Sequence, residues 1–139
     1  MVDLIVGKEG KGKSRVLLDY AAEQVKSANG NIVFLDRNTK NMYELSTKIR
    51  LIVVNDYDIK NSDEFIGFIL GLLSQDNDLE QILIDGFLEL SHLAHDDFVP
   101  TINRICEISN KFNVKVVISL CADAKDIPEG IDARIMAAL

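Results

Sequence analysis

Short apolar segments alternate with longer segments of mixed polarity along the whole chain. The short ones are rich in β-branched residues and lack a period-two alternation, which predicts strands buried on both faces. They cover residues 4–6, 32–35, 51–54, 82–84 and 114–120. Helical spacing of apolar residues predicts helices between them, over 14–26, 63–74 and 96–112, and on a weaker pattern over 39–48.

Alternating strands and helices of this length predict an α/β protein with a mostly parallel sheet. We expect a three-layer α/β/α sandwich in one domain spanning residues 1–139. In the last predicted helix, Asp96 is a candidate N-cap, and Pro100 falls in the first turn, where no intrahelical hydrogen bond is lost.

The predicted helix over 63–74 is apolar nearly all the way round. Such a helix is typically buried on more than one side. We expect it to be sheltered by neighbouring segments or to contact another chain, because soluble monomers seldom expose a contiguous apolar patch. A homo-oligomer or a protein partner is therefore a candidate assembly.

Composition narrows the classes of partner. The chain is 47% hydrophobic and 27% charged, with a formal net charge of −7, which disfavours nucleic acid as a partner. Its longest apolar stretch is too short to cross a bilayer, and its N-terminus lacks a signal-peptide pattern. Cys106 and Cys121 lie in apolar runs and are expected to be reduced core residues. These features predict a cytoplasmic protein that does not associate with membranes.

Residues Gly7 to Ser14 read G-K-E-G-K-G-K-S, a P-loop of the form G-x-x-x-x-G-K-S between a predicted strand and a predicted helix. Its glycines let successive N–H groups point into one concavity that receives phosphate oxygens. Lys13 is expected to reach the β- and γ-phosphates, and the Ser14 hydroxyl to ligate Mg²⁺. The candidate nucleotide-binding residues are Gly7, Lys8, Glu9, Gly10, Lys11, Gly12, Lys13, Ser14 and Arg15.

The apolar segment 82–84 ends in Asp85. After a P-loop, a strand that ends in a carboxylate has the pattern of a Walker B strand. We expect Asp85 to accept a hydrogen bond from Ser14 or from Mg²⁺-bound water and so position the metal.

With these two motifs, the chain resembles the RecA-like branch of P-loop NTPases, which includes recombinases, KaiC-type ATPases and replicative-helicase motors. The P-loop with Glu9 at its third position, the 82–86 strand, the 116–119 strand and the closing segment 132–136 carry the resemblance. It implies ATP and Mg²⁺ as ligands and strand order 3-2-4-5-1, with the P-loop strand as the first and a closing strand near 134–138 beside it. It also implies that the polar end of the 116–119 strand senses the γ-phosphate.

One position departs from this family. A glutamate that polarises the attacking water usually follows the strand corresponding to 32–35, and Asn38 stands there instead. An amide cannot act as a general base at neutral pH. Asp36 would substitute if the register differs by two residues, or it caps a turn. Four arginines are candidates for a finger supplied by a neighbouring subunit, or are ordinary surface residues: Arg37, Arg50, Arg104 and Arg134.

These observations favour an ATP-binding RecA-like NTPase with weak or partner-dependent hydrolysis, acting as a nucleotide-gated switch or assembly subunit. The alternatives are a small nucleotide or nucleoside kinase, disfavoured because no arginine-rich lid is evident, and a non-enzymatic interaction module that keeps a nucleotide site. A metal site at His92, His95 and Asp96 is disfavoured because no fourth ligand is evident.

Overall fold

Parallel strands and intervening helices build the molecule. The computed structural model describes residues 1–94 and 97–139. The strands are β1 (Val2–Gly7), β2 (Asn31–Asp36), β3 (Ile49–Val53), β4 (Leu79–Ile84), β5 (Lys115–Cys121) and β6 (Arg134–Ala138). The α-helices are α1 (Lys13–Val25), α2 (Ser62–Gln75), α3 (Phe87–Leu90) and α4 (Val99–Phe112). Short 3-10 turns cover Met42–Glu44, Val54–Tyr57 and Ala124–Asp126.

The six strands form one sheet in the order β3-β2-β4-β5-β1-β6, and neighbouring strands pair in parallel. This confirms the predicted α/β fold, the order 3-2-4-5-1 and the closing strand beside the first. The P-loop strand β1 is separated from the Asp85 strand β4 by β5. All strands therefore bring their carboxyl ends to the same edge of the sheet.

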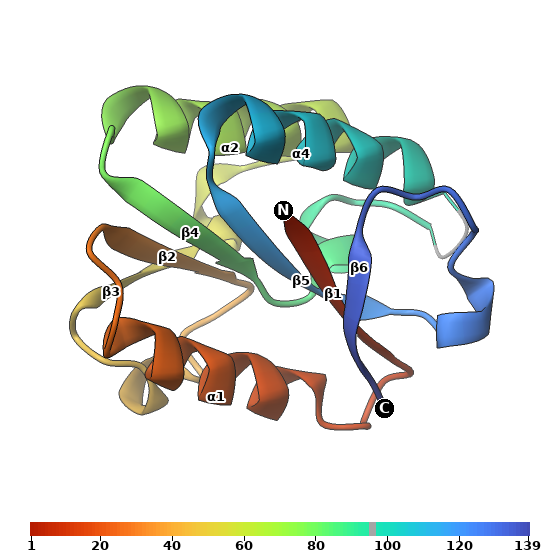
Figure 1. The fold of residues 1–139 in the computed structure, drawn as a ribbon, viewed down its shortest axis with the longest axis horizontal. Helices are drawn as coiled ribbons and strands as arrows, with labels where there is room; N and C mark the ends of the chain where they lie inside the picture. The colour runs from red at the N-terminus through yellow and green to blue at the C-terminus, as the bar shows by residue number, and fades with distance from the viewer. Residues whose placement is uncertain (95–96) are drawn as a thin grey trace.

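Helices cover both faces of the sheet, with α1 on one face and α2 and α4 on the other (Figure 1). Alternate residues of each strand face opposite sides, so two apolar clusters form. Beneath α1, Leu17 and Ala21 pack on Ile5 and Phe34. The larger cluster beneath α2 and α4 includes Leu4, Val6, Phe65, Ile69, Ile82, Ile102, Ile105 and Ile118.

Helix α2 is sheltered within its own chain, as one of the two expected arrangements required. Asn61 caps its start by accepting a hydrogen bond from the Glu64 N–H at 2.9 Å, and the Glu64 carboxylate accepts one from the Lys60 N–H at 2.7 Å. Phe65 is fully buried, and half-buried Phe68 lies beside the Tyr57 ring at 5.7 Å between centroids. No second chain is needed to cover this helix.

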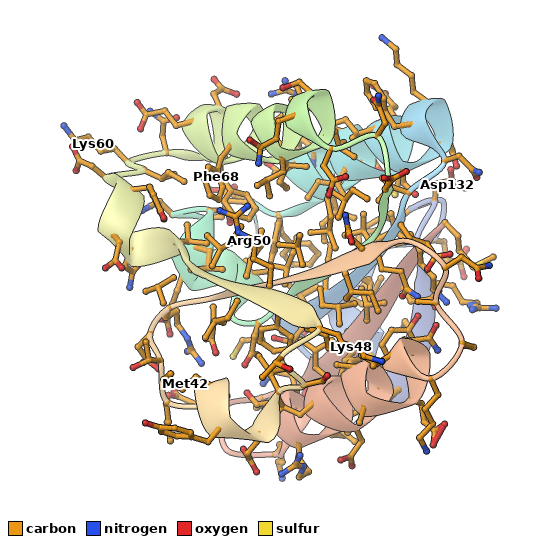
Figure 2. All side chains as sticks on the ribbon, turned by 90° about the vertical axis from the view of Figure 1, so that its left-hand side faces the viewer. Met42, Lys48, Arg50, Lys60, Phe68 and Asp132 are labelled. Carbon is orange, nitrogen blue, oxygen red and sulfur yellow. The ribbon has the colours of Figure 1, made fainter. Side chains whose placement is uncertain are left out.

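Figure 2 looks onto the β3 edge of the sheet, with Phe68 beneath α2 and the charged Lys48 and Arg50 near the edge strand. Both cations are exposed. Charged side chains at a sheet edge oppose strand pairing between copies of a protein.

The predicted helix over 39–48 is wrong, because only the 3-10 turn Met42–Glu44 forms there. Two polar side chains hydrogen-bond locally to the backbone instead. Asn38 Oδ1 accepts from the Lys40 N–H at 2.9 Å, and Ser46 Oγ accepts from the Lys48 N–H at 3.2 Å. Such bonds compete with helical backbone bonding, and none of the residues in the 3-10 turn is buried.

Helix α4 begins at Val99, three residues later than predicted, with Pro100 in its first turn as expected. The candidate N-cap Asp96 lies outside the described residues. Across residues 1–94 and 97–139, none of the helices is long and apolar enough to cross a lipid bilayer.

We predict that Phe65→Ala lowers the free energy of unfolding by about 3–5 kcal/mol. Phe65 is fully buried and meets Phe87 edge-on, with 6.1 Å between ring centroids. Phe112→Ala is the control, because that ring is 45% exposed, and its loss should stay below about 1 kcal/mol. Urea unfolding followed by circular dichroism measures both, and equal losses would contradict the packing of α2.

Candidate nucleotide-binding site at the carboxyl edge of the sheet

The P-loop connects the end of β1 to the start of α1 through two glycines in the left-handed region. Gly10 has φ 81° and Gly12 has φ 94°, conformations that side chains with a Cβ adopt rarely. Gly12 is the N-cap of α1 and carries no side chain that could bond its first N–H groups. The positive end of the helix dipole therefore faces the loop without a capping carboxylate, which suits an anion.

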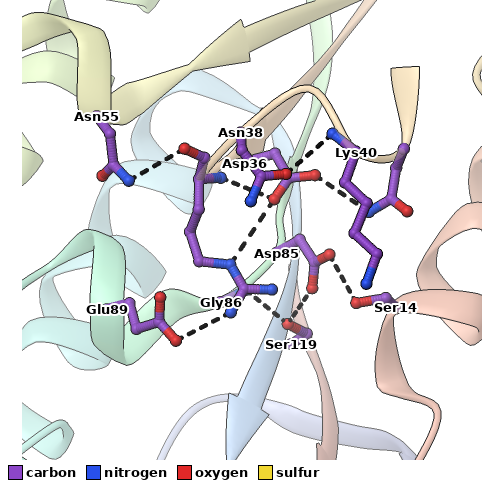
Figure 3. A network of polar contacts seen from close by, with 11 residues as sticks. Ser14, Asp36, Asn38, Lys40, Asn55, Asp85, Gly86, Glu89 and Ser119 are labelled. Carbon is purple, nitrogen blue, oxygen red and sulfur yellow. Dashed lines mark hydrogen bonds and ion pairs between the residues drawn. The ribbon is translucent and has the colours of Figure 1, made fainter.

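A chain of hydrogen bonds joins the P-loop to the ends of β4 and β5 (Figure 3). Ser14 Oγ donates to Asp85 Oδ2 at 2.8 Å, as the sequence predicted. Ser119 Oγ donates to Asp85 Oδ1, also at 2.8 Å, and accepts from the Gly86 N–H at 2.8 Å. Asp85 is only 2% exposed. These two bonds give both of its carboxylate oxygens a partner inside the protein, where water does not reach them.

A cavity of about 600 Å³ opens beside this network. That volume lies within the range of small-ligand pockets. Six of the predicted site residues line it: Glu9, Gly10, Gly12, Lys13, Ser14 and Asp85. Ser119, expected to sense the γ-phosphate, lines it too. Lys13 Nζ donates to the Lys8 carbonyl oxygen at 3.0 Å, so the ammonium group is held close to the loop.

The other predicted nucleotide-binding residues, in the loop and just after it, do not line the cavity. Gly7 is buried at the end of β1, and Lys11 is exposed. The Lys8 ammonium pairs with Asp123 at 3.5 Å. Arg15 points along α1 and pairs with Glu44 at 2.7 Å.

The two candidate catalytic residues lie at the end of β2 and beyond it, outside the cavity lining. Asp36 is 1% exposed, and its oxygens accept from the Arg37 N–H at 2.7 Å and from Asn41 Nδ2 at 3.2 Å. Asn38 is exposed, and its side-chain oxygen is bonded to the Lys40 N–H. Asp36 thus accepts hydrogen bonds from the turn that follows β2, the arrangement that its turn-capping role requires.

Burial raises the pKa of Asp36 above the ordinary value of 3.8, and the nearby charge of Asp85 raises it further. Hydrogen bonds from the Arg37 N–H and Asn41 and the charge of Arg37 oppose the increase only in part. The folded protein therefore holds a proton on Asp36 more readily than the unfolded chain does.

Sequence reasoning did not place two further basic side chains, Arg37 and Lys40, in this cavity. Arg37 and Lys40 line it together with Glu89, and Arg37 Nη1 donates to Glu89 Oε1 at 2.9 Å. The sequence marked Arg37 only as a candidate finger for a neighbouring subunit. Its position directly after a strand of the parallel sheet was a usable signal, because such residues gather at the carboxyl edge with the P-loop.

The remaining candidate arginines lie elsewhere. Arg104 on α4 pairs with Asp63 at 3.0 Å. Arg134 on β6 makes two hydrogen bonds of 3.0 Å to the buried carboxylate of Asp3. Arg50 is on the edge strand β3. Of the disfavoured metal site, His95 and Asp96 lie outside the described residues.

The donor set fits a nucleotide with Mg²⁺. Among the described residues, no three His, Cys, Asp or Glu side chains cluster as a metal site of their own. Mg²⁺ is commonly held by one or two protein oxygens together with phosphate oxygens and water. The Ser14 hydroxyl and the Asp85 carboxylate meet beside the P-loop, where phosphates would complete such a set.

Comparison with known proteins supports this architecture. No family model matches the chain, and no curated protein matches its sequence. The structure is similar to the crystal structure of flagellar accessory protein FlaH from Methanocaldococcus jannaschii, with a TM-score of 0.55 and 14% sequence identity. The fold is RecA-like. The match covers 94% of this chain and 64% of the FlaH chain. The likeness at this identity concerns the fold alone.

We predict that Asp36→Asn raises the melting temperature at neutral pH. The amide keeps a hydrogen-bond acceptor for the Arg37 N–H. It also removes the buried negative charge of a carboxyl whose pKa is raised. Well below pH 3.8 the wild-type carboxyl is protonated in both folded and unfolded states. There the folded state's preference for the protonated carboxyl contributes to stability. The wild type loses that contribution as pH rises through the raised pKa of the folded state.

Melting curves from pH 3 to pH 8 measure the difference between the two proteins. It should be smallest at the acid end and grow toward neutrality. Asp132→Asn, at an exposed carboxylate, is the control and should show little change at any pH. A stability difference for Asp36→Asn that does not vary with pH would contradict the assignment to buried charge.

Proposed function

We propose that the chain binds ATP with Mg²⁺ and hydrolyses it slowly or only with a partner, as a nucleotide-gated switch or assembly subunit. The observation that carries this proposal is the 2.8 Å hydrogen bond between Ser14 and Asp85. It joins the P-loop to the end of β4 and places a hydroxyl and a carboxylate in the lining of a ligand-sized cavity.

Each residue has a part in binding. The backbone N–H groups around Gly10 and Gly12 and the start of α1 receive phosphate oxygens. Lys13 leaves the Lys8 carbonyl to contact the terminal phosphates, where its charge is better paired. Ser14 and Asp85 hold Mg²⁺, which neutralises charge on the phosphates.

The end of β2 supports slow hydrolysis. Position 38 holds an amide, which cannot accept a proton from the attacking water at neutral pH. The Asp36 carboxylate is buried and engaged by two hydrogen-bond donors. Neither side chain is placed to act as the base in this arrangement, which supports slow hydrolysis by the isolated chain.

The strand order disfavours the alternative of a small nucleotide kinase. A small nucleotide kinase is expected to have its P-loop strand directly beside the Walker B strand, and here β5 lies between β1 and β4. A non-enzymatic interaction module that keeps a nucleotide site remains the second candidate, favoured by Asn38. The intact set of Lys13, Ser14 and Asp85 favours binding over its loss.

Isothermal titration calorimetry with ATP and Mg²⁺ tests binding. Lys13→Ala should reduce affinity at least tenfold, because a charge-assisted contact to phosphate is lost. The fold should keep its stability, since the lysine makes only an exposed hydrogen bond. Lys26→Ala removes an exposed lysine just beyond the other end of α1 and should bind as the wild type does. Equal affinity of a folded Lys13→Ala would refute P-loop binding.

Phosphate release by the isolated protein should be on the order of 10⁻² per second or slower, the range of NTPases that lack a complete catalytic set. The charge-neutral Asp36→Asn should leave this slow rate within about twofold if Asp36 only caps its turn. Asn38→Glu should raise it by restoring a carboxylate at the position of the usual base. Fast wild-type turnover that Asp36→Asn abolishes would instead identify Asp36 as the base.

A further inference from the structure

Arg37 is held in the cavity by contacts that leave part of its guanidinium unused. Nη1 is bonded to Glu89 Oε1 at 2.9 Å. Nε is buried and has no hydrogen-bond partner among the described residues, and the nearest carboxylate oxygen of Asp36 is 3.9 Å away. A buried donor without an acceptor is uncommon, and each instance calls for an explanation such as an absent ligand.

The backbone around Arg37 is fixed, so its side chain is aimed rather than free. The Arg37 N–H donates to Asp36, and its carbonyl accepts from Asn55 Nδ2 at 3.0 Å (Figure 3). Its guanidinium crosses the α-carbon of Gly86, where a Cβ would meet Nε at 2.9 Å. Gly86 also has φ 79°, so the residue after Asp85 leaves room for the arginine.

The partner of Arg37 is easily exchanged. The Glu89 side chain is 65% exposed on the four-residue helix α3, and exposed ion pairs contribute little net stability. A nucleotide in the same cavity presents a terminal phosphate with several charged oxygens. Guanidinium binds such groups in a bidentate way, more strongly than it binds one carboxylate oxygen in water.

We propose that Arg37 reads the terminal phosphate of the bound nucleotide from within the same chain, exchanging its contact with Glu89 for one with the γ-phosphate. The inference rests on the proposed function, since it needs a nucleotide on the P-loop. Arg37, Lys13 and Ser14 line one cavity, so a γ-phosphate held by the loop would share that cavity with the arginine. ADP lacks that group and leaves the pair with Glu89 in place. The exchange makes the site selective for triphosphate and breaks the contact between Glu89 on α3 and the residue that follows β2.

Calorimetry with ADP and with the non-hydrolysable analogue AMP-PNP, each with Mg²⁺, tests the proposal. Arg37→Gln should weaken AMP-PNP binding about tenfold or more and leave ADP binding within about twofold. Glu89→Gln frees the arginine and should strengthen AMP-PNP binding by up to about fivefold, with ADP unchanged. Arg104→Gln is the matched control. It removes an exposed arginine that also has one carboxylate partner at 3.0 Å but lies outside the cavity.

The outcomes separate this inference from the proposed function. If the wild type binds neither nucleotide, both fail. If it binds both and Arg37→Gln changes them equally or not at all, the phosphate-reading role fails while nucleotide binding stands. If Arg37→Gln is unfolded by circular dichroism, Glu89→Gln decides alone. Its tighter AMP-PNP binding supports the exchange, and an unchanged or weaker affinity overturns it.

Discussion

The buried carboxylate of Asp85 is the constraint on which the site depends. A charge with 2% exposure is tolerated only when hydrogen bonds replace water, and here two hydroxyls from different elements do so. Ser14 supplies one from the first turn of α1, and Ser119 supplies the other from β5. The need to satisfy Asp85 therefore ties the P-loop to the central strands and fixes the position of the Ser14 hydroxyl.

Much of the fold follows from the sequence pattern. Fully buried strands read as continuous apolar runs, and the four inner strands β1, β2, β4 and β5 confirm that interpretation. The edge strands β3 and β6 are partly exposed. The order of the strands came from the resemblance to RecA-like proteins, because periodicity says nothing about which strands are neighbours. The segment 39–48 was mispredicted because Asn38 and Ser46 bond locally to the backbone. Such competition depends on side-chain geometry that a residue pattern does not contain.

The candidate site, like the fold, could be predicted from the sequence only in part. Residues whose roles depend on fixed spacing were predicted, and Ser14 meets Asp85 as expected, since a P-loop and a strand end leave little freedom. The Arg37–Glu89 pair was not predicted, because it joins long side chains from the residue after β2 and from α3, whose directions are set by tertiary contacts. One such contact is with Gly86, which carries no Cβ that would block the guanidinium. Only the folded structure shows that the guanidinium crosses this glycine.

Three charged side chains of the cavity already have polar partners within the protein. Arg37 is paired with Glu89, Lys13 with a backbone carbonyl, and Asp85 with two hydroxyls. A polyphosphate with Mg²⁺ would bring negative and positive charge together into this arrangement. Such binding would exchange hydrogen-bond partners within a framework already held by the sheet, so the rearrangement would involve only a few side chains. Because α3 begins two residues after Asp85 and carries Glu89, the proposed exchange would act on the short helix that directly follows β4.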